Sequence, residues 1–117
     1  MTKAALTRWV ERYVRAWNSN DPAEIGGLFT DRARYATGPF DAPWRGRATI
    51  VRSWLARRDP PGAAAFRYEI LSASGDTGIV RGSTVYRSPR REFSNIWLVR
   101  LDASGRCREF TEWWMQR

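Results

Sequence analysis

Residues 94–114 read SNIWLVRLDASGRCREFTEWW and contain two runs rich in apolar and aromatic side chains. The turn-forming sequence Asp-Ala-Ser-Gly at 102–105 separates the runs. Two such runs on both sides of a short turn that contains glycine are typical of a β-hairpin. The pattern therefore predicts two antiparallel strands, over 92–101 and 106–115.

The second of these strands has an acid in its most aromatic part. Successive side chains of a strand point to opposite faces, so Phe110, Glu112 and Trp114 share one face. Thr111 and Trp113 share the other face. An apolar stripe with one carboxylate has two interpretations. It is a core with a buried ion pair, or it is the wall of a pocket.

The remaining elements follow from the same two periodicities. Alternation predicts further strands at 33–37, 65–73 and 78–87. Helical spacing of apolar residues predicts helices at 3–18, in a short segment after Asp21, and at 47–58. The segment 38–47 is predicted to be a loop that contains Phe40 and Trp44. These elements predict an α+β fold, with three helices packed on the concave face of a curved, mostly antiparallel sheet.

Length and composition limit the possible functions. The 117 residues suffice for one core, so we expect a single domain over 1–117. The chain has no histidine and its twelve acids are dispersed, so we expect no metal site. One cysteine, Cys107, excludes an internal disulfide and favours a cytoplasmic location. Residues 1–20 are charged throughout, unlike a signal peptide, and no apolar run is long enough for a membrane span.

The net charge of +8 raises the question of nucleic-acid binding. The arginines are scattered, with only short pairs such as Arg57-Arg58 and Arg90-Arg91. This arrangement indicates a solvated surface, so we do not expect nucleic acid as a partner. The aromatic content of 14% instead favours a roomy interior or a ligand cavity.

Three stretches resemble one known family. ERYVRAWNSNDPAEIGGLFTDRARY at 11–35 is similar to the opening of the nuclear-transport-factor-2-like superfamily, and in particular to its SnoaL-like group. WRGRATIV at 44–51 and the hairpin at 94–114 are similar to later parts of the same group. The resemblance covers the whole chain. It implies a cone-shaped fold with a deep pocket, and relatives that include ketosteroid isomerase and polyketide cyclases.

Alignment with ketosteroid isomerase sets the register of the pocket. Its oxyanion-hole tyrosine falls on Tyr13, its catalytic aspartate on Thr37, and its second oxyanion donor on Trp97. Because threonine cannot replace the aspartate as a base, the resemblance argues against steroid isomerisation by that constellation. Asp41 lies four residues after Thr37 and would have to move inward to replace it.

The same register predicts which side chains face the pocket. They are Val80, Gly82, Thr84 and Tyr86 on one strand, Asn95, Trp97 and Val99 on the next, and Phe110, Glu112 and Trp114 on the last. We therefore predict Glu112 as a catalytic base, with Tyr13 and Asn95 stabilising a developing oxyanion. The predicted ligand-binding residues are Trp17, Tyr35, Thr37, Phe40, Trp44, Thr84, Tyr86, Trp97, Phe110 and Trp114.

Two classes of function remain open at this stage. The first is a cofactor-free isomerase, cyclase, dehydratase or hydrolase that acts on a small apolar or polycyclic molecule. The second is a non-catalytic ligand-binding or structural domain in which Glu112 forms an ion pair with an arginine. In the second class the cavity holds a ligand or is filled by side chains. The predicted partner is a small apolar or aromatic ligand. The resemblance also implies a homodimer, formed through an outer sheet face that contains Ile96, Leu98, Thr111 and Trp113.

Overall fold

The computed structural model describes all residues from 1 to 117. Its helices are α1 (Lys3–Ser19), α2 (Pro22–Gly26) and α3 (Arg47–Ala56). Its strands are β1 (Phe29–Ala36), β2 (Trp44–Arg45), β3 (Ala64–Ser74), β4 (Thr77–Arg87), β5 (Arg90–Leu101) and β6 (Cys107–Gln116).

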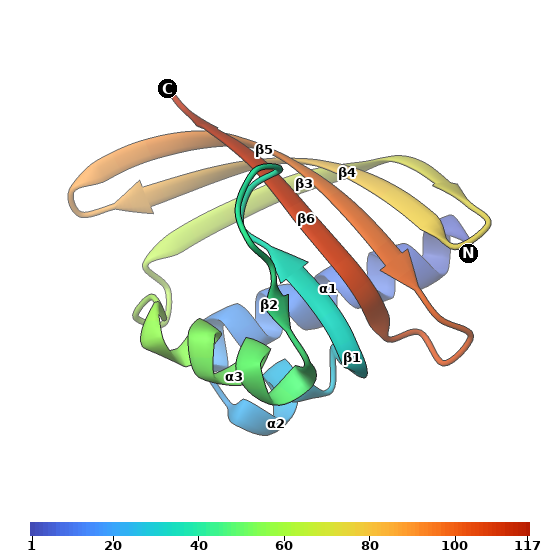
Figure 1. Ribbon diagram of the computed structural model, residues 1–117. Helices are drawn as coiled ribbons and strands as arrows, with labels where there is room; N and C mark the ends of the chain where they lie inside the picture. Colours follow the sequence, from blue (N-terminus) through green and yellow to red (C-terminus); the bar gives the residue numbers. More distant parts are fainter.

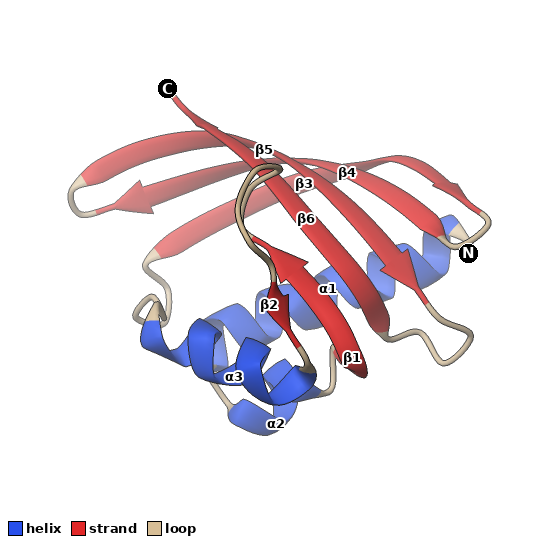
Figure 2. Ribbon diagram, in the orientation of Figure 1, coloured by secondary structure: helices blue, strands red, loops and turns tan.

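The six strands form one curved sheet in the order β2-β1-β6-β5-β4-β3. Each neighbouring pair is antiparallel except β1 and β6, which run parallel. The helices lie together on one side of the sheet (Figure 2), and α1 runs beneath the long strands (Figure 1). This arrangement confirms the predicted α+β class. None of the helices has the length and apolar character needed to cross a membrane.

The sequence prediction was wrong at the edge of the sheet formed by β1 and β2. Trp44 and Arg45 belong to the predicted loop but form a short strand that pairs with β1. Trp44 lies opposite Tyr35 and stacks on its ring, with the ring centroids 4.8 Å apart. A strand of two residues has no period to recognise. β1 also begins earlier than predicted, because Phe29 pairs with Cys107 of β6.

An aromatic cluster joins α1 to the concave face of the sheet. The ring of Tyr13 stacks on Phe110, with centroids 5.7 Å apart, and packs against Trp97 at 4.6 Å. Phe110 also stacks on Tyr35 at 4.5 Å. Such aromatic pairs contribute about 0.5–1.5 kcal/mol each beyond the area that they bury. The cluster therefore holds the helix in place against β1, β5 and β6.

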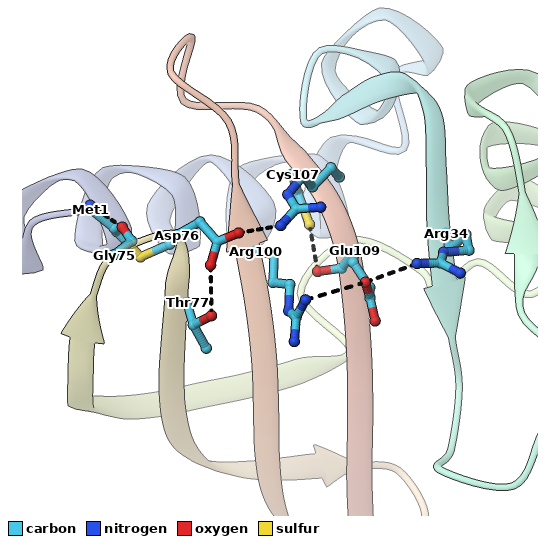
Figure 3. Close-up of polar contacts among 9 residues, drawn as sticks. Met1, Arg34, Gly75, Asp76, Thr77, Arg100, Cys107 and Glu109 are labelled. Atoms are coloured by element: carbon cyan, nitrogen blue, oxygen red, sulfur yellow. Dashed lines mark hydrogen bonds and ion pairs between the residues drawn. The ribbon is translucent and has the colours of Figure 1, made fainter.

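The opposite face of the sheet has polar contacts between strands (Figure 3). Glu109 on β6 accepts a hydrogen bond from Arg34 on β1 at 3.0 Å, and it lies 4.0 Å from Arg100 on β5. Asp76, in the turn before β4, pairs with Arg108 on β6. Exposed ion pairs of this kind contribute about 0–1 kcal/mol each. The apolar packing on the concave face therefore supplies more of the stability than these pairs do.

Glycine at position 82 allows two aromatic side chains to pack on the concave face. A β-carbon added to Gly82 would lie 2.4 Å from Cε1 of Phe66 on the neighbouring strand β3. Phe66 stacks nearly flat on Trp97, with centroids 4.8 Å apart and the planes inclined by 12°. The missing side chain at Gly82 thus creates the space that this stack occupies.

Replacing this glycine tests the packing. Gly82→Ala should displace the Phe66 ring and lower the free energy of unfolding by about 1–3 kcal/mol, the usual cost of overpacking a core. Urea unfolding monitored by tryptophan fluorescence measures the change. Ser83→Ala alters the next residue, which is exposed, and should have little effect. Equal stability of Gly82→Ala and the wild type would contradict the close contact.

Candidate functional site

A cavity of about 370 Å³ opens between the helices and the concave face of the sheet. Eleven of the thirteen predicted site residues line it, namely Tyr13, Trp17, Tyr35, Thr37, Trp44, Thr84, Tyr86, Asn95, Trp97, Glu112 and Trp114. The periodicity of β4, β5 and β6 positions most of these side chains, since alternate residues of each strand face the helices. The structure therefore brings together side chains from α1 and from five strands.

Two predicted ligand-binding residues do not reach the cavity. Phe40 lies in the bend after β1 and is 99% exposed, so its ring points into solvent. Phe110 is completely buried, because it packs between Tyr13 and Tyr35 in the aromatic cluster. Asp41 accepts a hydrogen bond from Thr37 at 3.0 Å but does not line the cavity either. The carboxylate missing at position 37 is therefore not supplied by Asp41.

Glu112 is held in the cavity wall by two hydrogen bonds to one of its oxygens. Nε1 of Trp97, directly opposite on β5, donates to Oε2 at 2.7 Å. Nδ2 of Asn95 donates to the same Oε2 at 3.0 Å. Oε1 accepts no hydrogen bond from the protein. The only side-chain nitrogen and oxygen atoms that are both buried and without a partner are Asn20 Oδ1 and Arg100 Nε, so Oε1 is not fully buried. Oε1 is therefore accessible from the cavity.

Burial raises the pKa of Glu112 above its ordinary value, and the hydrogen bonds from Trp97 and Asn95 oppose this rise. Removal from water disfavours the charged carboxylate, whereas donors to the carboxylate favour it. The net upward direction makes the group easier to protonate than an exposed glutamate. A carboxyl group with a raised pKa is better suited than an ordinary glutamate to accept a proton and return it.

Asn95 orients this carboxylate through a chain of side-chain hydrogen bonds. Its Oδ1 accepts a hydrogen bond from Oγ1 of Thr84 at 2.9 Å, which fixes the amide so that Nδ2 points at Glu112. Both Thr84 and Asn95 are buried. Both the oxygen and the nitrogen of the Asn95 amide already make hydrogen bonds. This geometry suits an amide that positions Glu112 better than one that donates to an oxyanion, the role predicted from the sequence.

The hydroxyl groups of Tyr13 and Tyr35 form a second polar pair in the cavity. They lie 2.6 Å apart and both rings are buried. Burial, followed by neighbouring charges, raises the pKa of each hydroxyl well above its ordinary value, so both remain protonated donors. Only one of the two protons is used in their mutual hydrogen bond. The other can be donated to an oxygen atom of a ligand.

No ion pair neutralises Glu112. The seven ion pairs of the structure involve other acids, and no arginine nitrogen lies within 4.0 Å of the Glu112 carboxylate. The alternative prediction of a structural ion pair was therefore wrong. The indole of Trp97 and the amide of Asn95 supply the hydrogen bonds that such a partner would have made.

A family model for the SnoaL-like domain matches residues 10–110. The chain belongs to the SnoaL-like domain family. Solved structures in the nuclear-transport-factor-2-like superfamily share its fold, although their sequences are only distantly similar. The residues discussed above therefore lie in a SnoaL-like cavity, within a fold that supports many different activities.

Three solved structures illustrate this likeness. SalBIII, described as an epoxide hydrolase/cyclase-like enzyme in pyran ring formation in salinomycin, has a TM-score of 0.75 at 15% identity, over 93% of this chain and 89% of its own. An M. tuberculosis LEH-like epoxide hydrolase has a TM-score of 0.68 at 16% identity, over 97% of this chain and 84% of its own. A ketosteroid isomerase-like protein from Erwinia carotovora atroseptica has a TM-score of 0.69 at 16% identity, over 98% of this chain and 97% of its own. A comparison with curated proteins found no match.

The SnoaL-like cavity also contains residues that sequence analysis did not select. These are Trp54, Arg57, Arg58, Asp59, Arg91 and Phe93. Arg91 and Phe93 lie on the same face of β5 as Asn95 and Trp97, at alternate positions nearer the start of the strand. The alternation used for Asn95 and Trp97 would therefore also have predicted them. The segment 57–59 follows the end of α3, where no period applies. Only the folded chain shows that this segment borders the cavity.

The missing ion pair leads to a prediction about stability and pH. Because the pKa of Glu112 is raised by folding, the folded protein binds this proton more tightly than the unfolded chain. Wild-type stability should therefore fall as the pH rises from the ordinary glutamate value of about 4.5 through the raised value. Glu112→Gln cannot lose a proton and should lack this decrease, so at neutral pH it should be no less stable than the wild type.

Thermal unfolding of both proteins between pH 4 and pH 9 tests this expectation. Glutamine keeps an oxygen that can accept from Trp97 and Asn95, so the variant should fold. A large loss of stability at neutral pH, of about 3–5 kcal/mol, would instead indicate a broken buried ion pair. That result would contradict the assignment of neutral partners to Glu112.

Proposed function

We propose that this protein is an enzyme that binds a small molecule in the SnoaL-like cavity and transfers a proton through Glu112. One observation carries the proposal: Oε2 of Glu112 is anchored by Trp97 and Asn95, while Oε1 is open to the cavity. An anchored carboxylate with one free oxygen and a raised pKa is suited to remove a proton and return it.

The tyrosine pair supplies the complementary function. When Glu112 removes a proton from a carbon or from an attacking hydroxyl or water, negative charge develops on another oxygen of the substrate. The free hydroxyl proton of the Tyr13–Tyr35 pair can stabilise this oxygen. The aromatic walls exclude water and hold an apolar ring system. This chemistry covers isomerisation, ring closure, dehydration and hydrolysis, and it requires no cofactor.

The structural relatives support this range of reactions without choosing among them. Two are described as epoxide hydrolase-like and one as ketosteroid isomerase-like. Their identities to this chain are 15–16%, so the likeness supports the fold and the place of the cavity rather than a substrate. A cytoplasmic location, suggested by composition, stays a prediction.

Turnover of simple probes tests the role of Glu112. Styrene oxide reports epoxide opening and 3-cyclohexen-1-one reports isomerisation of a double bond. Glu112→Gln should lower kcat on an accepted probe by about 10²–10⁴, the usual contribution of a positioned acid or base. Glu109→Gln makes the same change on the outer face of β6 and should leave kcat unchanged. If the probe binds and Glu112→Gln turns it over as fast as the wild type, Glu112 is not the base.

Removing the tyrosine hydroxyls tests the donor pair separately. Tyr35→Phe and Tyr13→Phe each leave one hydroxyl without its partner. Loss of a donor to a developing oxyanion commonly lowers kcat by about 10²–10³. Because the donor acts mainly in the transition state, KM should change much less than kcat. A rise in KM at constant kcat would show that the pair only binds substrate.

We further propose a homodimer formed through the outer face of β5 and β6. Ile96, Leu98 and Thr111 lie partly exposed on this face beside Trp113, which is 41% exposed. A contiguous apolar patch that contains a tryptophan is typical of an interface.

Trp113→Arg should convert the dimer to a monomer in sedimentation velocity, whereas Ser104→Arg in the β5–β6 turn should not. A monomeric wild type at micromolar concentration would refute the dimer.

A further inference from the structure

Three arginines at the cavity have no acidic partner. Arg57 and Arg58 follow the end of α3, and Arg91 lies near the start of β5. The seven ion pairs of the structure use other arginines. All three side chains are exposed residues that still line the cavity, so they form its rim rather than its floor.

Two of these guanidinium groups are held in place by aromatic rings. Arg57 lies over Trp44, 5.4 Å from the ring centroid. Arg91 lies over Tyr86 at 4.6 Å and near Phe93 at 6.0 Å. A contact between an arginine and an aromatic face uses no N–H donor, so the donors of both side chains stay available to a ligand. Arg58 differs because it already donates to the Leu55 carbonyl at 3.2 Å.

Hydrogen bonds of Asp59 anchor the loop after α3, which contains Arg57 and Arg58. Oδ2 of Asp59 accepts hydrogen bonds from Nε1 of Trp17 at 2.9 Å and from the hydroxyl of Tyr86 at 3.0 Å. Nδ2 of Asn20 donates to the Asp59 carbonyl at 2.9 Å. Tyr86 therefore touches Asp59 through its hydroxyl and Arg91 through its ring. The α3 loop and the start of β5 meet at this tyrosine.

Asp59 does not neutralise the rim. No arginine nitrogen lies within 4.0 Å of its carboxylate, and its Oδ2 already bonds to two neutral donors. Three cations and one anion thus border the opening. An anionic group of a ligand would find free N–H donors there, in the planar geometry that suits a carboxylate.

Arg91 and the residue opposite Glu112 lie at different positions along β5. Arg91 precedes Trp97 by six residues on β5, and Trp97 is the residue directly opposite Glu112. At about 3.3 Å per residue, their backbone positions are roughly 20 Å apart along the strand. A ligand with its anion beside Arg91 can therefore extend along β5 toward Glu112.

We propose that the ligand is an aromatic or polycyclic carboxylate whose anionic group binds at the rim that Arg57 and Arg91 border. Its flat body then lies along the aromatic walls, and its reacting end points toward Glu112. The orientation of the ligand, with its reacting end toward Glu112, rests on the proposed function. The anion site itself rests on the arginine geometry and can be tested without turnover.

A matched pair of probes tests the anion site. 2-Naphthoate and 2-naphthamide share the same rings and similar size, but only the first is charged at pH 8. Isothermal titration should show that wild-type protein binds naphthoate at least about tenfold more tightly than naphthamide. Raising the salt from about 50 to about 500 mM should weaken naphthoate binding and leave naphthamide binding unchanged.

Substitutions then assign the preference to the rim. Arg57→Gln/Arg91→Gln should reduce the difference between the two probes to within about twofold, with each single change giving part of the loss. Arg106→Gln removes the same charge from the β5–β6 turn and should keep the preference. The inference is overturned by equal wild-type affinities, by no naphthoate binding at millimolar concentration, or by a preference that survives the double substitution.

The two proposals can fail separately. If Glu112→Gln retains turnover while the double arginine variant loses the naphthoate preference, the proton-transfer role fails and the anion site stands. If Glu112→Gln abolishes turnover while wild type binds both probes equally, only the ligand class is wrong. The salt dependence of wild-type binding gives a result even if the double variant does not fold.

Discussion

The register between β5 and β6 is the constraint on which the site depends. It places Trp97 directly opposite Glu112, so the indole N–H reaches the carboxylate at 2.7 Å. A slip of one residue would turn Glu112 to the outer face and bring Trp113 into the cavity. The stacking of Phe110 on Tyr13 and on Tyr35 would be lost with it, because Phe110 would turn to the outer face as well. Core packing and site chemistry therefore select the same register.

The cavity wall accommodates the Glu112 carboxylate because two neutral donors hydrogen-bond to it. A buried charge needs hydrogen bonds, but a charged partner would also have to be removed from water. Trp97 supplies apolar area and a donor with one side chain, and Asn95 is oriented by Thr84. This arrangement leaves one oxygen of Glu112 free. The same feature that makes burial tolerable thus leaves one carboxylate oxygen accessible from the cavity.

The cavity changes in character from its floor to its rim. Its inner part consists of aromatic rings and buried polar side chains, whereas its opening has guanidinium groups that lie over Trp44 and Tyr86. Tyr86 links the two parts, since its ring supports Arg91 and its hydroxyl bonds Asp59. An amphipathic ligand would match this gradient. A purely apolar ligand would leave the arginines at the rim unused.

The sequence by itself determined the helices, the long strands and the face of β6 that contains Glu112, because local periodicity records which side of an element is buried. The partners of Glu112 and the cavity position of Arg57, Arg58 and Asp59 were decided only by the tertiary structure. These contacts join segments far apart in the chain, such as Trp17 with Asp59, and no local period encodes them. The two-residue strand β2 exists for the same reason, since its pairing and its stacking on Tyr35 arise only once the chain has folded.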